Sequence, residues 1–456
     1  MDIKSSIAAS FDEEVSALQG VLRIRSVENL GENGTVFGQG VADCLDYVLK
    51  LGEAMGFTAR DVDGRCGYLE YGSGEELVTV LGHLDVVPEG TGWTYPPYAA
   101  EIHDGKIYAR GAIDDKGPMM AALYALKAVR DAGPALNRRV RLLFGLNEET
   151  GCNCVKHYVD KGEELPVFGF TPDGDFPIIH GEKGICTVLY HYDLQPGAKV
   201  IRRFFGGSAL NMVSAAATAD LDWPEAERAQ VLLRHAEGIT VAETETGLRV
   251  TAVGRSAHGS KPELGISAIT RLAAFLAELP LEDNSRAFAS AVASLYAQNT
   301  IGEALGIDLR DEVSGPMVVN LGTAATEGST VTLGVNLRVP VTFGAADFHD
   351  TMTAAMAKAG FRESDFHFTE PLYVPADSPL IRKLQKVYEA ETGTPAFLEV
   401  IGGGTYAKTM PNIVAFGPIF PGENCVEHEP DEFIALDSLK KMTEIYASAM
   451  VELANG

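Results

Sequence analysis

Acidic and imidazole side chains occur at five places along the chain, and their types suit the binding of metal ions. They are His83 and Asp85 in GHLDVVP, Asp114 and Asp115 in GAIDDKGP, Glu148 and Glu149 in NEETG, Asp173 in FTPDGDFP, and His428 in NCVEHEP. Carboxylate oxygens and imidazole nitrogens are ligands of the kind that bind Zn²⁺ or Mn²⁺. Two such ions about 3.5–4 Å apart, which share a carboxylate and a water molecule, would use a set of this size.

Each of these places also has an ordinary structural interpretation, which is favoured when the place is taken alone. The His-x-Asp pair would be a hydrogen-bonded pair at a strand end, and the two aspartates would cap a helix, an interpretation that we favour for Asp115. The two glutamates would be surface charge at a strand exit. Pro-Asp-Gly around Asp173 is common in turns, and His428 would be a loop histidine.

The five places together favour a metal site, because four of them follow predicted strands of one sheet. Adjacent glutamates also suit metal-assisted hydrolysis. A carboxylate that binds a metal has its lone pairs committed, so a separate carboxylate must take the proton from the attacking water. Glu148 and Glu149 can divide these two tasks.

The elements that would position these residues alternate between helix and strand over residues 1 to about 180. FDEEVSALQGVL predicts a helix, whereas LVTVLG and VRLLFGL predict buried strands, and this alternation is typical of a βα sheet. In extended backbone, positions i and i+2 share a face, so His83 and Asp85 would be neighbours at the carboxyl end of a strand. Open α/β sheets bind ligands at that end. A helix is predicted to begin after Asp115 and to stop at Gly133-Pro134.

The pattern changes between about residue 184 and residue 370 to short strands, such as GLRVTAVG, interleaved with helices such as ISAITRLAAFLAEL. We interpret residues 184–370 as an inserted α+β domain. Residues 1–183 and 371–456 then form a discontinuous first domain that carries the predicted metal ligands.

Composition limits the classes of partner. The chain has 456 residues, of which 46% are hydrophobic and 22% charged, and its net charge of -26 argues against nucleic acid and anionic membrane surfaces as partners. Neither a signal peptide nor a membrane span is readable, which predicts a cytoplasmic protein. The six cysteines do not suggest a disulfide framework. For Cys152 and Cys154, two buried structural thiols are favoured over a third metal or a redox role.

The order of the motifs resembles a known family. GHLDVVP, DGKIYARGAIDDKGP, NEETG, FTPDGDFP, RSAHGSKP, NLRVP, GGGTYAK and the late His428 are similar to the signature of the co-catalytic zinc metallopeptidases, which include aminoacylase, carboxypeptidase G and carnosinase-type dipeptidases. Within these, the chain resembles the peptidase V, or Xaa-His dipeptidase, branch. The resemblance covers nearly the whole chain. It implies an α/β, phosphorylase/hydrolase-like fold with a mixed-sheet catalytic domain, interrupted by an inserted α+β lid domain.

Site roles follow from the resemblance, residue by residue. The implied ligands of two divalent ions, with Zn²⁺ favoured and Mn²⁺ as the alternative, are His83, Asp114, Glu149, Asp173 and His428, and Asp114 bridges both ions. Glu148 matches the general base. Asp85 matches the carboxylate that fixes the tautomer and ring orientation of a histidine ligand.

The inserted domain and a late glycine turn are implied to contact the substrate. His258 resembles a lid histidine that closes over the scissile carbonyl, although a Ser/Gly-turn histidine is the ordinary alternative. The residues that resemble substrate-holding positions are Asn211, Arg338, Gly403, Gly404 and Thr405. Arg338, which follows a predicted strand, would otherwise be a surface charge. Ser214 and Lys408 depart from the branch, which often has proline and arginine there, and this weakens the substrate assignment more than the chemistry.

The resemblance implies metal-dependent hydrolysis of unblocked dipeptides. The alternatives are an N-acyl amino acid deacylase or an N-succinyl-diamino acid hydrolase on the same metal core and, in a different class, a non-catalytic metal-stabilised binding protein. The expected partner is a small peptide. The insertion is long enough to mimic a partner subunit, which favours a monomer and leaves a homodimer open.

Overall fold

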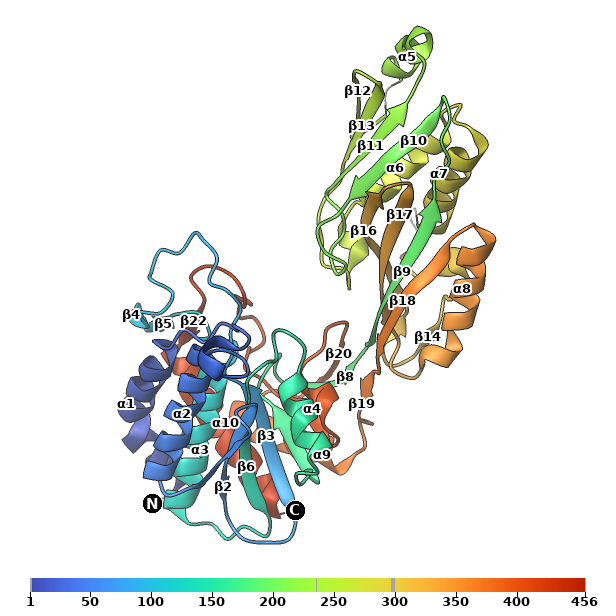
Figure 1. Ribbon diagram of the computed structural model, residues 1–456. Helices are drawn as coiled ribbons and strands as arrows, with labels where there is room; N and C mark the ends of the chain where they lie inside the picture. Colours follow the sequence, from blue (N-terminus) through green and yellow to red (C-terminus); the bar gives the residue numbers. More distant parts are fainter. Residues whose placement is uncertain (1, 235, 297–299, 456) are drawn as a thin grey trace. The chain divides into compact units, whose positions relative to one another are not determined.

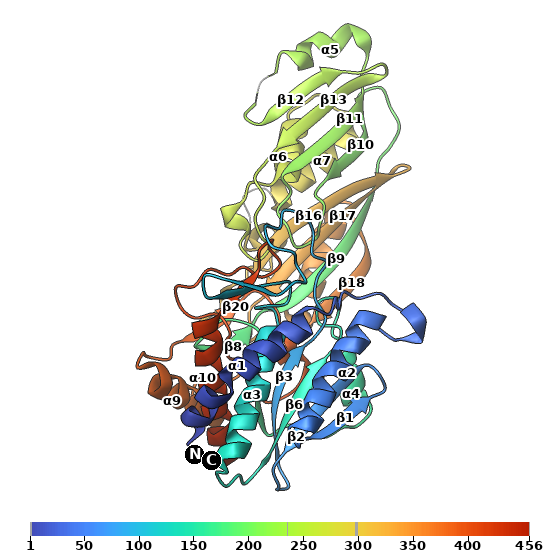
Figure 2. The ribbon, with the colours of Figure 1, turned by 90° about the vertical axis from the view of Figure 1, so that its left-hand side faces the viewer.

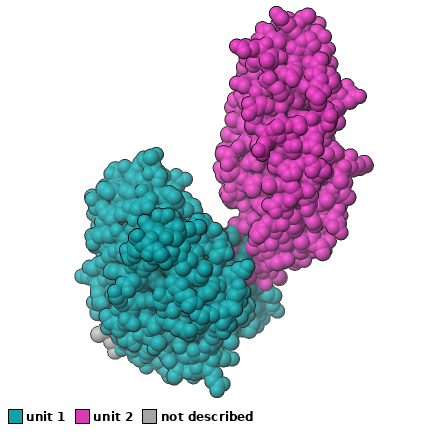
Figure 3. All heavy atoms as spheres, in the orientation of Figure 1, with its two compact units in different colours: residues 1–181, 374–399, 404–456 teal, residues 182–373, 400–403 magenta. Residues whose placement is uncertain are grey.

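The computed structural model describes residues 2–234, 236–296 and 300–455, which form two compact units (Figures 1 and 3). Unit 1 contains residues 1–181, 374–399 and 404–456, and unit 2 contains residues 182–373 and 400–403. Each unit has its own main sheet. Among the described residues, no helix combines the length and the apolar character needed to cross a membrane.

The main sheet of unit 1 is mixed, and its parallel centre carries the buried apolar strands. Its strands lie in the order β1 (Thr58–Val62), β2 (Cys66–Tyr71), β6 (Arg139–Gly145), β3 (Leu77–His83), β7 (Phe168–Thr171), β21 (Ile413–Ala415) and β8 (Ile178–Glu182). β3 pairs in parallel with both β6 and β7, with His83 opposite Gly145. Every residue of β3 is buried, as expected for a parallel strand covered on both faces.

Helices cover this sheet, and one of them begins at the predicted metal ligands. The helices of unit 1 are α1 (Ile3–Leu22), α2 (Gln39–Ala54), α3 (Lys116–Ala132), α4 (Asn153–Asp160), α9 (Pro379–Thr392) and α10 (Leu436–Asn455). α1, α3 and α10 pack against one another, and α3 and α10 contact β3 and β6, as the crowding of these elements in Figure 2 shows. α3 ends at Gly133 in the left-handed conformation, which confirms the predicted helix stop.

A small sheet joins two segments that are distant in sequence. It contains β4 (Glu101–His103), β5 (Lys106–Tyr108) and β22 (Phe433–Ala435), in the order β22-β5-β4. Ile107 of β5 lies opposite Ile434 of β22. The segment that leads to Asp114 is therefore held beside the segment that follows His428.

Unit 2 is an antiparallel sheet with helices against it. The strand order is β12 (Ile239–Glu243), β13 (Gly247–Val253), β11 (Ala216–Asp222), β10 (Val200–Gly206), β16 (Val318–Glu327), β17 (Thr330–Val339), β9 (Gly184–Asp193) and β18 (Arg362–Thr369). The helices are α5 (Glu225–Leu232), α6 (Ala268–Ala277), α7 (Asp283–Tyr296) and α8 (His349–Lys358). Figures 1 and 2 show α6 and α7 against one face of the sheet, where the buried core of this unit lies. Of the remaining short strands, β14 (Arg310–Asp311) and β15 (Gly315–Pro316) pair with each other, whereas β19 (Leu372–Tyr373) and β20 (Leu398–Ile401) pair with β8 of the main sheet of unit 1.

The glycine turn is divided between the units: residues 400–403 group with unit 2, although the sequence predicts them in the first domain, and Gly404 stays in unit 1. Residues 400–403 join unit 2 because Lys183 N donates to Ile401 O at 2.9 Å and Arg338 Nη1 donates to Gly402 O at 2.6 Å. The catalytic and lid roles of the two units stay predictions.

Candidate metal centre

Three of the predicted site segments lie at the carboxyl ends of neighbouring parallel strands. His83 is the last residue of β3, the glutamate pair follows β6, and Asp173 follows β7, in the sheet order β6-β3-β7. Asp114 precedes a helix, as predicted, and does not directly follow a strand of this sheet. It lies in the loop between β5 of the small sheet and α3, and α3 packs on β3, so the loop still reaches the same edge.

The predicted ligands form two groups that share Asp114. In one group are His83, Asp114 and Asp173, and in the other are Asp114, Glu149 and His428; within each group the ligand atoms lie within 4.8 Å of one another. His83 Nε2 lies 2.9 Å from Asp114 Oδ1 and 4.0 Å from Asp173 Oδ2. His428 Nε2 lies 2.9 Å from Asp114 Oδ2 and 3.2 Å from Glu149 Oε1.

This donor set fits two divalent cations. Asp114 offers one oxygen to each group, as a bridging carboxylate does, and every other donor belongs to one group only. The donors are oxygen and imidazole nitrogen, which Zn²⁺ and Mn²⁺ accept. The acids of the centre outnumber its histidines, so the centre attracts cations.

The pKa values of the side chains in the centre, without bound metal, also favour cation binding. Burial alone would raise the pKa of Asp114, but hydrogen bonds from His428 and His83 outweigh it and hold that pKa well below its usual range. The contacts with Asp114 and Glu149 raise the pKa of His428 to about 11. Burial would lower the pKa of His83, but its contacts with Asp114 and Asp85 raise it well above the ordinary value. Two protonated rings thus balance the carboxylates where cations would bind, and metal binding must displace these protons.

Two further carboxyl groups of the centre favour their neutral forms. Burial raises the pKa of Glu148 to about 8, and the nearby Glu149 and Asp114 add to this effect although His83 opposes it. Burial, followed by the charge of Asp114, raises the pKa of Asp173 well above its ordinary value.

Asp85 contacts the segment of the two glutamates as well as His83, the histidine that it is predicted to orient. Its backbone oxygen lies 2.9 Å from His83 Nδ1, whereas its carboxylate oxygen Oδ1 lies 3.5 Å from that nitrogen. The carboxylate instead accepts hydrogen bonds from Glu148 N at 3.1 Å and Glu149 N at 3.2 Å. Asp85 therefore orients the His83 ring mainly through its carbonyl, and it fixes the main chain of the glutamate pair through its side chain.

Asp115 is the N-cap residue of α3, as predicted, but its side chain makes no capping hydrogen bond. Asp115 Oδ2 accepts a hydrogen bond from His83 N at 3.0 Å instead, in a fully buried setting. The side chain of Asp115 thus ties the start of α3 to the end of β3.

Comparison with known proteins identifies the family. Residues 79–452 match the peptidase family M20/M25/M40. The chain belongs to this family. Two relatives named "putative dipeptidase" match nearly full length: YtjP of Bacillus subtilis at 44% identity over 96% of each chain, and a protein of Staphylococcus aureus strain MRSA252 at 32% identity over 99% of each chain. The predicted resemblance to co-catalytic metallopeptidases is confirmed, and the chain is a hydrolase that acts on peptide bonds.

Solved structures share the fold of this M20 chain. Human carnosine dipeptidase 1 matches with a TM-score of 0.60 and 17% identity over 99% of this chain and 98% of that one. The aminoacylhistidine dipeptidase of Vibrio alginolyticus matches with a TM-score of 0.59 and 15% identity over 95% of each chain. These similarities confirm the predicted α/β fold.

The cysteines of this M20 chain are free thiols. Cys44, Cys66, Cys154 and Cys186 are buried, as predicted for most of them. Cys154 Sγ lies 2.9 Å from the hydroxyl of Tyr406, whose ring packs edge-on against His83. Cys152 is only half-buried, so the expectation of two buried thiols near the centre holds for one.

In unit 2, the segments that carry Asn211 and His258 pair with each other. Met212 forms a bridge with His258, and Gly259 N donates to Asn211 O at 2.6 Å. His258 Nδ1 accepts a hydrogen bond from Ser260 N at 3.2 Å and lies 2.7 Å from Ser260 Oγ. The neutral ring must then carry its proton on Nε2, because a backbone N–H can only donate.

Arg338 is buried and is therefore not a surface charge. It lies within β17 rather than after the end of the strand. Its side chain is 4% exposed, and its Nη1 donates to Gly402 O, next to the predicted substrate-lining Gly403. Burial lowers its pKa to about 10. Gly404 and Thr405 belong to unit 1, where Thr405 Oγ1 accepts from Ala407 N at the start of the short helix η5 (Tyr406–Thr409). Ser214 is buried and donates from Oγ to Ala216 O.

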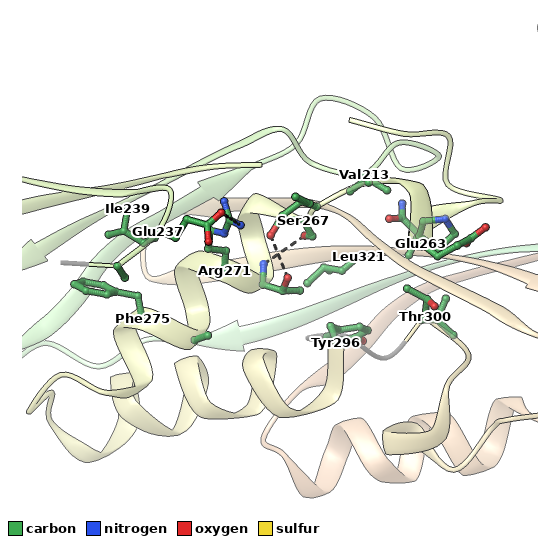
Figure 4. Close-up of a pocket in the computed structure, with 18 of the residues that line it drawn as sticks. Val213, Glu237, Ile239, Glu263, Ser267, Arg271, Phe275, Tyr296, Thr300 and Leu321 are labelled. Carbon is green, nitrogen blue, oxygen red and sulfur yellow. Dashed lines mark hydrogen bonds and ion pairs between the residues drawn. The ribbon is translucent and has the colours of Figure 1, made fainter. Parts of the chain in front are cut away.

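A separate hollow of about 640 Å³ lies in unit 2 beside α6, between that helix and β16 (Figure 4). The residues that line it include Arg271, Phe275, Tyr296 and Leu321, which are labelled in Figure 4. None of the residues that line it belongs to the predicted site, so this hollow is separate from the candidate chemistry.

The sequence did not single out Arg110 and Glu432, which the structure places beside the metal centre. Both are buried. Arg110 stands inside the block DGKIYARGAIDDKGP, and Glu432 closely follows His428. A charged residue inside a run of small apolar residues was a signal for Arg110.

Proposed function

We propose that this chain is a metal-dependent dipeptidase that hydrolyses dipeptides with a free amino terminus, with two divalent ions, Zn²⁺ favoured over Mn²⁺. The sharing of Asp114 between the two ligand groups carries the proposal. The dipeptidase names of the relatives in Bacillus subtilis and Staphylococcus aureus favour this substrate class over N-acyl amino acids.

Two ions, when bound, would polarise the scissile carbonyl and lower the pKa of a water molecule. The side chains of His83, Asp114 and Asp173 would hold one ion, and those of Asp114, Glu149 and His428 the other. Glu148 belongs to neither of these two ligand groups.

Glu148 is the proposed general base. Its carboxylate would accept a proton from the attacking water as the new C–O bond forms, and would then give that proton to the leaving amine as the C–N bond breaks. The hydrogen bond from Glu148 N to Asp85 fixes the main chain at this position. Burial raises the pKa of Glu148 in the absence of metal, whereas two bound cations would lower it, so that the carboxylate could accept a proton and then give it up.

Groups of unit 2 are proposed to bind the substrate. His258, with its proton on Nε2, would donate to the carbonyl oxygen as negative charge develops there. Burial lowers the pKa of His258, and Arg338 and Lys261 add to this, so the neutral ring prevails near pH 7. The guanidinium of Arg338 suits a terminal carboxylate. Asn211 and the turn of Gly403, Gly404 and Thr405 would contact the remaining polar groups, since glycine permits close approach.

A substrate panel tests the proposal. Purified protein, stripped of metal and reloaded with Zn²⁺ or Mn²⁺, should cleave free dipeptides and leave N-acetylated dipeptides and tripeptides largely intact. Preference for N-acyl or N-succinyl amino acids would establish the deacylase alternative instead. Binding of dipeptides without turnover, under all metals, would establish the non-catalytic alternative. We also propose a monomer, which light scattering of the metal-loaded protein would check.

A further inference from the structure

Arg110 and Glu432 form a buried ion pair beside the metal centre. Arg110 Nη1 lies 2.5 Å from Glu432 Oε2, and the two side chains are 2% and 0% exposed. The residues come from segments 322 positions apart in the chain, which β5 and β22 bring together. The guanidinium carbon also lies 5.2 Å from the centre of the Trp93 ring, which limits its rotation.

Each partner of this pair holds the main chain of a different ligand segment. Glu432 Oε1 accepts hydrogen bonds from Ile113 N at 3.0 Å and from Asp114 N at 3.3 Å. Arg110 Nη2 donates to His428 O at 3.2 Å. The ion pair is therefore a direct link between the backbone of the bridging aspartate and the backbone of the last histidine.

The backbone at His428 has a conformation that a hydrogen bond from Arg110 would help to maintain. His428 has a φ of 63°, a left-handed conformation that is unfavourable for a residue with a side chain. It lies in a loop without regular structure, and its side chain is half exposed. The hydrogen bond from Arg110 opposes relaxation of this backbone to a conformation that would turn the ring away.

Stability alone does not account for the pair. Desolvation of two charges often cancels their attraction, so a buried ion pair is frequently no more stable than apolar residues of the same size. A planar guanidinium, by contrast, can bond to a carboxylate and a carbonyl at once in a fixed geometry. The structure thus favours a positioning role over a stabilising one.

We propose that Arg110 and Glu432 are a positioning pair, which sets the place of His428 relative to Asp114 and so the affinity for the ion held by Asp114, Glu149 and His428. The inference rests on the proposed metal centre. The other ion depends less on the pair, because His83 and Asp173 are positioned by β3 and β7.

The test is a Co²⁺ titration of the metal-free full chain, followed by the visible absorbance of bound Co²⁺. Arg110→Lys keeps the charge beside Glu432 but shortens the reach to His428 O. Wild type should bind two ions, and Arg110→Lys should bind the weaker-held one roughly 10–100-fold less tightly, with the other changed by less than about threefold. His428→Ala identifies which of the two ions is lost.

Arg141→Lys is the matched control. Arg141 is also buried, and its Nη2 lies 2.5 Å from Glu70 Oε2, but it lies on β6 away from the ligand loops. Its variant should lower thermal stability comparably and leave both Co²⁺ affinities unchanged. If Arg110→Lys does not fold, Glu432→Gln, which keeps an oxygen for the amides of Ile113 and Asp114 but frees Arg110, should weaken the same ion.

The outcomes separate the two proposals. Two Co²⁺ affinities in Arg110→Lys equal to those of wild type would overturn the positioning role and leave the metal centre intact. Equal losses in Arg110→Lys and Arg141→Lys would also overturn it, since any buried arginine would then have the same effect. A wild-type chain that binds fewer than two ions would contradict the metal centre itself, and this inference with it.

Discussion

Glu14 lies in α1 with its side chain buried against α10, and the pH dependence of unfolding should reveal it. Thr443 Oγ1 donates to Glu14 Oε1 at 2.6 Å, whereas Oε2 is buried without a hydrogen-bond partner among the described residues. Burial raises the pKa of Glu14 from its ordinary value of 4.5 to about 8, although the hydrogen bond from Thr443 opposes this. The folded chain therefore favours the neutral acid, whereas the unfolded chain favours the carboxylate at neutral pH.

The sign and size of the effect follow from this difference. Because the folded-state pKa lies above the unfolded-state value, the contribution of Glu14 is fully present below the unfolded-state pKa and is lost as the pH rises through the folded-state pKa. One pKa unit corresponds to about 1.4 kcal/mol. The difference between 4.5 and 8 then corresponds to a loss on the order of 5 kcal/mol in the free energy of unfolding by pH 8.

Glu14→Gln removes the titration and keeps the acceptor for Thr443. Near pH 4.5 the variant and wild type should have similar free energies of unfolding, since both side chains are then mostly neutral in the folded state. Near pH 8 the variant should be the more stable protein, by an amount on the order of 5 kcal/mol. Urea unfolding followed by circular dichroism, at several pH values and a fixed metal concentration, measures the difference between the two proteins.

Glu13→Gln is the control, because Glu13 is the neighbouring residue on the same helix and is exposed. It should leave the pH dependence of wild type unchanged. Parallel curves for wild type and Glu14→Gln over the whole range would refute the reasoning, since the burial of Glu14 would then carry no protonation cost. An equal effect of Glu13→Gln would assign the dependence to overall charge rather than to the buried site.

Four further predictions concern the metal centre and the residues packed around it. Glu148→Gln should retain both ions in a Co²⁺ titration and lower turnover by at least about 10²–10⁴-fold, and wild-type turnover would remove its role as base. Asp85→Ala should weaken metal binding roughly 10–100-fold, because the amides that it holds lose their acceptor; unchanged affinity would contradict this. Metal binding at pH 7 should release protons, because the pKa of His428 is raised to about 11 and that of His83 is also raised; metal affinity should therefore fall as the pH falls. Calorimetry in buffers of different ionisation enthalpy measures this release, and a release of zero would mean that both rings are already neutral. Gly82→Ala should lower the free energy of unfolding by roughly 1–3 kcal/mol, because its Cβ would lie 2.1 Å from Asp115 Oδ2, and an unchanged midpoint of thermal unfolding would contradict that clash.

The strand ends of the centre could be predicted from sequence because their signals are local. The apolar run before His83 indicates a buried strand, and the polar residues that follow it mark where the strand ends. The stop of α3 at Gly133 was equally readable, since glycine adopts the left-handed conformation there at little cost. Periodicity and turn residues report this kind of information, which depends on neighbours in the chain.

The partners of the buried polar groups could not be read in this way. Sequence placed Asp115 at a helix start but did not show that its carboxylate bonds to His83 N. Arg338 is predicted to hold substrate, with a surface charge as the alternative, and nothing next to it in sequence indicates that the 400–403 segment lies against it. Arg110 and Glu432 are too far apart in the chain for any local pattern to connect them. Such contacts are set by how sheets and loops pack together.

Three buried carboxyl groups share a task that no local sequence pattern indicates, because each accepts hydrogen bonds from backbone amides at a ligand segment. Asp85 holds the glutamate pair, Asp115 holds His83, and Glu432 holds Asp114. Main-chain anchoring leaves the side-chain oxygens and nitrogens of the ligands free for cations. A variant that loses a ligand atom removes one donor, whereas a variant that loses an anchor moves a whole segment. Loss of Asp85 should therefore disturb the base and a metal ligand together, which loss of Glu149 alone cannot do.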